Sequence, residues 1–146
     1  MSRRTRAREI VLKCLYAYET LDKEAKTVFD DTCAKTSQDV RSTEFASNLY
    51  FGVIERLEEI DKQIASNAEN WNIDRFAVVD KNIMRMAVCE LFYFPDIPAK
   101  VSINEAIELA KKYSTVDSSS FVNGILDAIY RKNVAELEEK GKVRTE

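Results

Sequence analysis

Apolar residues recur every three or four positions along most of the chain, which is the spacing of one face of an α-helix. Over residues 5–20 they cover an arc of about 140° on a helical wheel, as in an amphipathic helix. Over residues 45–64 the stripe fits one helix, or two helices that meet near Gly52 or Asp61. Comparable stripes lie at residues 79–94, 103–110 and 122–129. The pattern therefore predicts a helical fold.

The segments between these stripes are polar or contain proline. Residues 21–40 are only weakly periodic, although Val28 and Phe29 suit a short helix or turn anchored on the core. Pro95 and Pro98 bracket the exit of the stripe that ends at residue 94. Because proline interrupts a helix, that helix is expected to end there.

Three polar residues beside these stripes carry structural predictions. Ser102 and Glu105 have the spacing of a capping box, which predicts that a helix starts at Ser102. Glu90 falls inside an apolar stripe, where burial would raise the pKa of an acid catalyst. Since no second catalytic group accompanies it, a hydrogen-bonded structural carboxylate is the better interpretation.

Composition narrows the fold class. The 146 residues include 3 glycines and 2 prolines, and tight turns and hairpins need these residues. An all-β fold is therefore disfavoured, and the expected class is all-α. Without an internal repeat or a linker, we expect one domain over residues 1–146, with residues 134–146 as a charged, solvated tail.

The residue types present exclude much common catalytic chemistry. The chain has no histidine, and its cysteines (Cys14, Cys33 and Cys89) are far apart without a CxxC pair. Histidine-based catalysis, a disulfide framework and a cysteine-rich metal site are therefore not supported. No stretch resembles a signal peptide or a membrane span. We expect no cofactor, no metal, no membrane association and a reducing, cytoplasmic location.

Positive charge gathers at the N-terminus. Residues 1–13 hold five cations and one anion, so this stretch carries +4 and the remaining residues carry −7 of the net −3. Within it, residues 1–8 form a basic arm. Arginines at a helix N-terminus oppose the helix dipole, so helix stability does not explain them. Phosphate binding is one interpretation, and a solvated face that aids solubility is the other.

On the same helical wheel, Tyr16 points about 160° away from the centre of the apolar stripe, among Arg6, Arg8 and Lys13. An exposed aromatic ring among cations suits single-stranded RNA, because bases stack on the ring while the cations hold phosphates. The alternative is that Tyr16 packs under a neighbouring loop.

Residues 117–124 place several hydroxyl groups at the start of the last helix. The sequence is DSSSFVNG. Free N–H groups at such a helix start bind anions such as phosphate. Taken alone, the segment is better explained by an ordinary serine or aspartate N-cap with Phe121 in the core.

Three sequence segments resemble those of one known family. They are RRTRARE at residues 3–9, followed by the pair Leu15-Tyr16, VSINEAIELAK at residues 101–111 and FVNGILD at residues 121–127. In this order they resemble the NusB family of transcription antitermination factors, over about Arg3 to Arg131. The resemblance implies an all-α fold of about seven helices in two packed subdomains.

The resemblance also implies a function. Members of the family bind the boxA element of single-stranded ribosomal-operon RNA together with NusE, a small-subunit ribosomal protein. With other Nus factors they join elongating RNA polymerase and suppress premature termination. The family's RNA contacts carry over onto Arg4, Arg6, Arg8, Tyr16, Ser118 and Phe121. The middle helices carry the partner surface, on which we expect Asp80 and an exposed Arg85.

The chain departs from the family pattern at two places. Thr5 stands where an additional arginine is usual, and Ser119-Ser120 replaces a pair that is commonly His-Lys. Each lost cation removes a potential phosphate contact, so the intrinsic affinity for RNA is expected to be lower than is typical of the family.

Two other functions compete with this one. NusB-like domains also begin larger RNA cytosine methyltransferases, but the chain ends at Glu146 and has no glycine-rich nucleotide-binding loop. We therefore expect no enzyme activity. The second alternative is a helical protein that self-associates without binding RNA.

Overall fold

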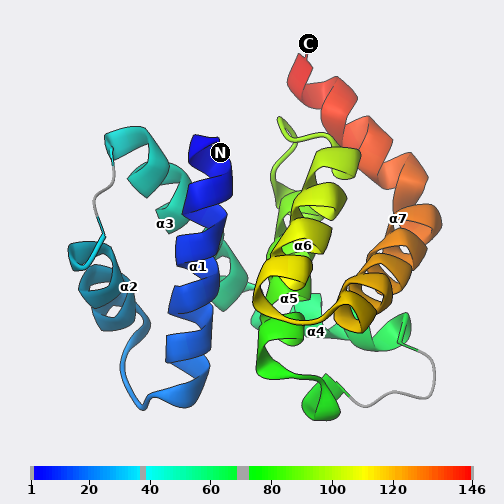
Figure 1. The fold of residues 1–146 in the computed structure, drawn as a ribbon. Coiled ribbons are helices and arrows are strands. Elements are labelled where there is room, and N and C mark those ends of the chain that lie inside the picture. The colour runs from blue at the N-terminus through cyan, green and yellow to red at the C-terminus, as the bar shows by residue number, and fades with distance from the viewer. Residues whose placement is uncertain (1, 37–38, 69–72, 146) are drawn as a thin grey trace. The chain divides into compact units, whose positions relative to one another are not determined.

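The computed structural model describes residues 2–36, 39–68 and 73–145, and within these ranges the regular secondary structure is entirely helical (Figure 1). The elements are α1 (Arg3–Thr20), α2 (Ala25–Ala34), α3 (Val40–Glu55), α4 (Leu57–Ser66), the 3₁₀ turn η1 (Ile73–Arg75), α5 (Val78–Tyr93), α6 (Ala99–Tyr113) and α7 (Val116–Thr145). The prediction of an all-α fold with about seven helices is confirmed.

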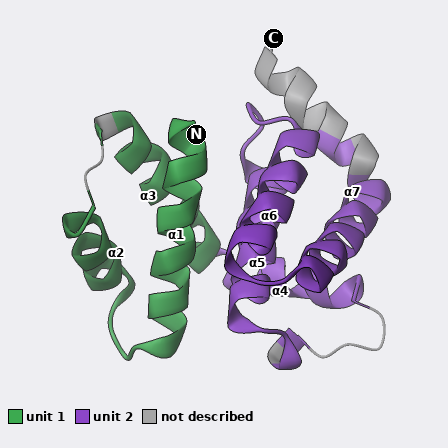
Figure 2. Cartoon of the chain, viewed as in Figure 1, with its two compact units in different colours: residues 1–55 green, residues 56–146 purple. Residues whose placement is uncertain are grey.

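The chain divides into two compact units, coloured separately in Figure 2. Unit 1 comprises Met1–Glu55 and holds α1 to α3, and unit 2 comprises Arg56–Glu146 and holds α4 to α7. The boundary between the units falls within the long apolar stripe at residues 45–64, for which the sequence allows one helix or two. The stripe forms two helices that meet at Arg56, whose backbone leaves the helical region at φ −117°, ψ 22°.

In unit 1, α1 packs against α3 and α2. The predicted stripe of α1 is buried, with Val11 and Cys14 fully inaccessible. The short helix expected around Val28 and Phe29 is α2, and both side chains are buried. Tyr50 of α3 anchors α2, because its hydroxyl donates to the carbonyl of Ala25 at 2.9 Å and its ring stacks on Phe29.

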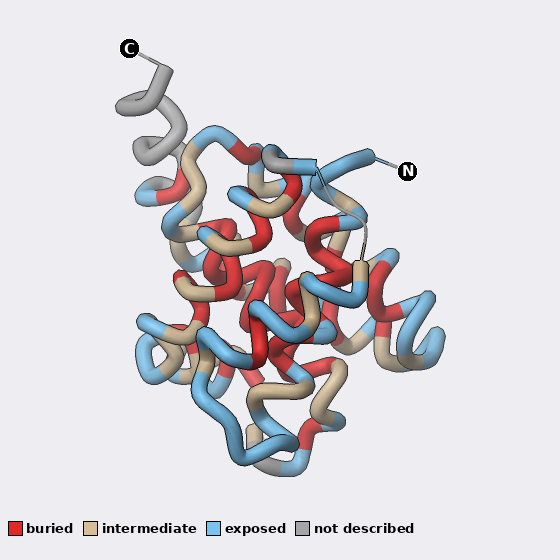
Figure 3. Tube along the Cα trace, turned by 90° about the vertical axis from the view of Figure 1, so that its left-hand side faces the viewer, coloured by how far each residue is buried: buried red, intermediate tan, exposed pale blue. Residues whose placement is uncertain are grey.

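In unit 2, α5 packs against α4, α6 and α7. Every residue from Asp80 to Leu91 is buried, including the charged ones, and the trace in Figure 3 shows such buried stretches in red. The apolar stripe at 79–94 predicts only one buried face. The structure buries all sides of the helix, so its polar residues need partners within the protein.

The predicted capping box at Ser102 is wrong. Helix α6 begins three residues earlier, at Ala99, after Pro98, whose φ of −60° is fixed by its ring. Ser102 therefore lies inside the helix, where its hydroxyl is buried and donates to Glu90 Oε1 at 2.8 Å. The prediction that Glu90 is a hydrogen-bonded structural carboxylate is confirmed.

Arg85 is buried rather than exposed, so that part of the sequence prediction is wrong. Its Nε and Nη2 donate to the two carboxylate oxygens of Asp61 at 2.8 Å each, a bidentate pair between α5 and α4. Its Nη1 donates to Asn82 Oδ1 at 3.1 Å. Arg85 joins these helices within unit 2.

Helix α7 continues through the segment expected to be a solvated tail. Leu137 is 6% exposed, whereas Glu136 is exposed. The side chains at 134–135 and 138–146 lie outside the described residues. The solvation of that tail, like the assignment of residues 1–146 to one domain, stays a prediction.

The single-domain prediction has a direct test. A chain of this size is expected to unfold in one cooperative transition. Heat or urea unfolding followed by far-UV circular dichroism and by Trp71 fluorescence should give superimposable curves. Two separated transitions would contradict the prediction.

We expect Arg85→Ala to lower the free energy of unfolding by about 3 kcal/mol, because it leaves the partly buried Asp61 carboxylate without its cation. Urea unfolding measures this. The control is Arg131→Ala, which removes an exposed ion pair with Asp127 and should cost less than about 1 kcal/mol. Equal losses in the two variants would show that the Arg85 pair is no more than a surface contact.

Candidate nucleic-acid interface

The basic arm is the first turns of α1. Ser2 caps the helix by accepting the N–H of Thr5 at 3.0 Å, and the first turn contains no acidic residue. Arg3 is paired with Asp39 at 2.9 Å. The serine cap gives the helix a defined start, and the arginines at 3, 4, 6 and 8 lie in its first two turns.

The structure places the three predicted RNA-contact arginines differently. Arg6 is exposed, as expected. Arg4 is exposed and its guanidinium lies over the Phe45 ring, 4.8 Å from the centroid. Arg8 lies over the same ring at 5.4 Å but is only 3% exposed, so it is not the outward-pointing cation that the helical wheel indicates.

Tyr16 is 47% exposed, as the wheel predicts. Lys13 beside it is also exposed, but Glu9 and Leu12 on the same side of α1 are buried. The accessible part of this side therefore begins near Lys13. The Tyr16 ring is thus accessible for stacking, and Lys13 provides a cation one turn away. That this ring binds RNA stays a prediction.

The second candidate region is the α7 start, defined here as residues 114–121. Thr115 Oγ1 accepts the N–H of Ser118 at 3.0 Å, so a threonine caps this helix. The Ser118 hydroxyl donates to Asp80 Oδ2 at 2.8 Å and accepts from the Ser114 and Thr115 hydroxyls at 3.0 Å each. Ser118, expected to contact RNA, thus binds α5 within unit 2.

Phe121 is half-buried. Its ring meets that of Phe76 edge to face, with centroids 5.1 Å apart and planes at 89°. Phe76 lies just before α5, so this contact also joins the α7 start to the α5 start. The core interpretation of Phe121 is correct in part, and part of the side chain remains accessible.

Asp80, expected on the partner surface, is 6% exposed. It stands in the first turn of α5, where a carboxylate interacts favourably with the helix dipole. Because both Asp80 and Arg85 are engaged inside unit 2, neither presents its charge at the surface.

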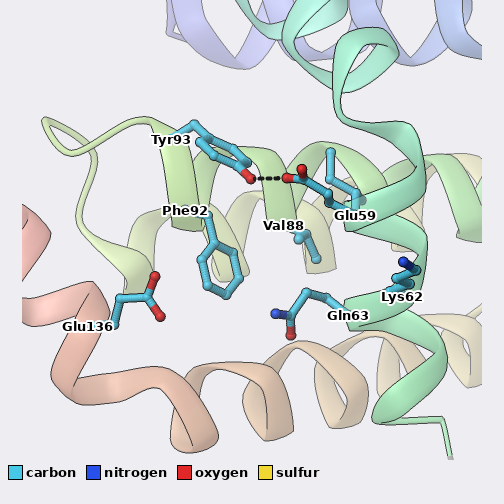
Figure 4. A pocket seen from close by; sticks show the side chains of 8 residues that line it. Glu59, Lys62, Gln63, Val88, Phe92, Tyr93 and Glu136 are labelled. Atoms are coloured by element: carbon cyan, nitrogen blue, oxygen red, sulfur yellow. Dashed lines mark hydrogen bonds between the residues drawn. The ribbon is translucent and has the colours of Figure 1, made fainter.

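The sequence gives no indication of a groove that unit 2 forms among α4, α5 and α7, with a volume of about 350 Å³. Its lining, drawn in Figure 4, consists of Glu59, Ile60, Lys62, Gln63, Val88, Phe92, Tyr93 and Glu136. Tyr93 is held from two sides: its hydroxyl donates to Glu59 Oε2 at 2.9 Å, and Arg56 lies 4.1 Å over its ring. Burial and the Glu59 hydrogen bond raise the pKa of Tyr93.

The described residues do not form a group suited to hold a metal ion. Burial raises the pKa of the Cys14 thiol to about 11, which keeps it protonated and unreactive near neutral pH. No helix within the described ranges has the length and hydropathy that a bilayer span requires.

Known proteins place the chain in a family. The NusB family model matches residues 5–131. "Transcription antitermination protein NusB" of Thermodesulfovibrio yellowstonii is 41% identical, over 90% of this chain and 94% of that protein. The protein of the same name from Chloroherpeton thalassium is 44% identical over 94% of this chain, which spans only 64% of that relative's length.

Solved structures agree with the sequence matches. T. maritima NusB superposes with a TM-score of 0.82 at 38% identity, covering 90% of this chain and 92% of that one. A structure of antitermination factors NusB and NusE in complex with dsRNA contains a chain that superposes with a TM-score of 0.83 at 28% identity. The match covers 90% of this chain and 98% of that one. With most of its length matched by the family model and by these relatives, the chain belongs to the NusB family.

Proposed function

We propose that this protein is a transcription antitermination factor that binds boxA RNA together with NusE. The observation that carries the proposal is the family match over residues 5–131, with relatives named for antitermination. A similar solved chain is described in a complex with NusE and RNA. These names favour antitermination over the methyltransferase and the self-association alternatives.

In this proposal, each unit contributes one RNA-contacting region. Unit 1 offers the basic arm with Arg4 and Arg6, and Tyr16 further along α1. The cations neutralise phosphates, and the tyrosine ring stacks on a base. Unit 2 offers the α7 start with the accessible edge of Phe121. Arg8 and Ser118 support these regions from inside their units.

The protein partner meets the acidic part of the chain. Residues outside 1–13 carry −7, which repels RNA but attracts a basic ribosomal protein. We place the contact at the groove of unit 2 rather than at Asp80 and Arg85, since those charges are buried. Its lining includes the apolar side chains of Ile60, Val88 and Phe92 together with the carboxylates of Glu59 and Glu136. The ammonium of Lys62, also in the lining, lies 3.7 Å from Glu58 Oε1.

The role follows from the two partners. With NusE at the groove of unit 2 and RNA on the basic arm, the protein links nascent ribosomal-operon RNA to elongating RNA polymerase and the other Nus factors. We expect this activity to take place in the cytoplasm. Neutralisation of the acidic field by NusE would let both proteins hold one RNA strand with a favourable coupling free energy.

We expect Arg6→Ala to weaken binding of a labelled boxA RNA and to reduce the slope of log K against log salt by about 0.7, the value for one lost single-strand phosphate contact. Fluorescence anisotropy at several salt concentrations measures both quantities. Lys26→Ala is the control, because Lys26 is an exposed cation on α2. If Arg6→Ala and Lys26→Ala behave alike, the arm is only a solvated face.

We expect Tyr16→Ala to weaken RNA binding by about 1 to 3 kcal/mol with little change in salt slope, because a stacking ring is lost and no charge is removed. Tyr16→Phe keeps the ring and should bind as the unchanged protein does. Unchanged affinity in a folded Tyr16→Ala variant would remove Tyr16 from the interface.

We expect RNA to bind the mixture with NusE more tightly than either protein alone, and NusE to bind this chain more tightly with RNA by the same factor. Glu136→Lys at the groove should weaken the NusE contact. Glu108→Lys, an equal charge change on the exposed side of α6, should not. A mixture no tighter than the better single protein refutes co-binding, whereas equal behaviour of the two variants refutes only the groove as the contact.

A further inference from the structure

We infer that Asp80 is a positioning residue for RNA binding: its buried carboxylate fixes the α7 start in the form that meets RNA. The inference rests on the proposed function, because the α7 start is one of the two proposed RNA-contacting regions. It also assigns Asp80 and Ser118 a shared role, where the sequence suggests a partner contact and an RNA contact.

The hydrogen bond between them determines the direction of the network. A carboxylate can only accept, so the single proton of Ser118 points to Asp80 Oδ2, 2.8 Å away. Both lone pairs of the Ser118 oxygen then face Ser114 and Thr115, which donate to it. The hydroxyl has no capacity left for a phosphate oxygen.

Thr115 completes the arrangement, because it also accepts the backbone N–H of Ser118. Ser114 and Thr115, which lie in the connection between α6 and α7, both donate to the Ser118 Oγ on α7. The Ser118 hydroxyl in turn donates to Asp80 on α5. Without the Asp80 acceptor, the proton of Ser118 would no longer have a fixed direction. The direction of the hydrogen bonds among Ser114, Thr115 and Ser118 would then not be determined either.

The second Asp80 oxygen adds no hydrogen bond that would stabilise the fold locally. Oδ1 is buried and has no hydrogen-bond partner among the described residues. A buried polar atom without a partner is destabilising. What the carboxylate does provide is an acceptor that a hydroxyl from another helix, 38 residues away in sequence, can reach.

The ring contact of Phe76 with Phe121 acts on the next turn of the same segment. Together, the Asp80–Ser118 bond and this contact hold residues 118 and 121 to the residues that begin α5. A binding segment that is ordered before it meets its ligand loses less conformational entropy on binding. Asp80 therefore contributes to RNA affinity without touching RNA.

The test measures binding of a labelled boxA RNA oligonucleotide at one salt concentration, after circular dichroism has shown each variant to be folded. We expect Asp80→Ala to bind about tenfold more weakly, the loss of one hydrogen bond to a charged group. Its salt slope should be unchanged, because no phosphate contact is removed. Asp80→Asn keeps an acceptor and should bind at least as tightly as the unchanged protein.

Ser118→Ala is the second variant, and alanine is well tolerated in a helix. We expect it to weaken binding as Asp80→Ala does, and the double variant to lose no more than either single one. Additive losses would mean that Ser118 contacts RNA independently, which overturns the inference. Asp61→Ala removes another carboxylate that pairs with α5, and it should leave RNA affinity unchanged.

Three further outcomes would contradict either the inference or the proposed function. If Asp80→Ala binds RNA normally but binds NusE more weakly in the absence of RNA, Asp80 is a partner contact and the inference is wrong. If Asp80→Asn is as weak as Asp80→Ala, the acceptor is not what matters and the inference is wrong. If the unchanged protein fails to distinguish boxA RNA from a scrambled oligonucleotide, the proposed function itself fails.

Discussion

The fold of unit 2 depends on the burial of charged side chains along α5. Each of three such residues meets a different neighbouring helix: Arg85 pairs with Asp61 of α4, Glu90 accepts from Ser102 of α6, and Asp80 accepts from Ser118 of α7. A buried charge is costly without its partner, so each of these bonds disfavours a displacement of the helix that carries the partner.

The same burial explains which sequence predictions succeeded. Glu90 lies within an apolar stripe, and its structural role is predictable from that position. Asp80 and Arg85 lie outside the strongest part of the stripe, and charged residues are exposed in most proteins, so the pattern indicates a surface location. Periodicity reports one buried face. It does not report that further helices cover the opposite face, because this depends on tertiary packing.

Local rules failed where two of them competed. Ser102 and Glu105 satisfy the spacing of a capping box, but Pro98 provides an earlier helix start and the Ser102 hydroxyl is used by Glu90. On α1, the wheel places Tyr16 on the surface correctly and Arg8 incorrectly. The groove involves three helices distant in sequence, so single-sequence patterns do not contain it.

The two arginines on the Phe45 ring change the physical character of the basic arm. A free arginine side chain samples many rotamers, and holding it still on a phosphate costs rotational freedom. Arg4 and Arg8 already rest on one aromatic ring, from successive turns of α1. The ring also keeps two like charges near each other, at a spacing set by the helix rather than by mutual repulsion. Arg4 and Arg8 thus hold their charges at positions set by the ring, so shortening either arginine or removing the ring would alter where positive potential lies.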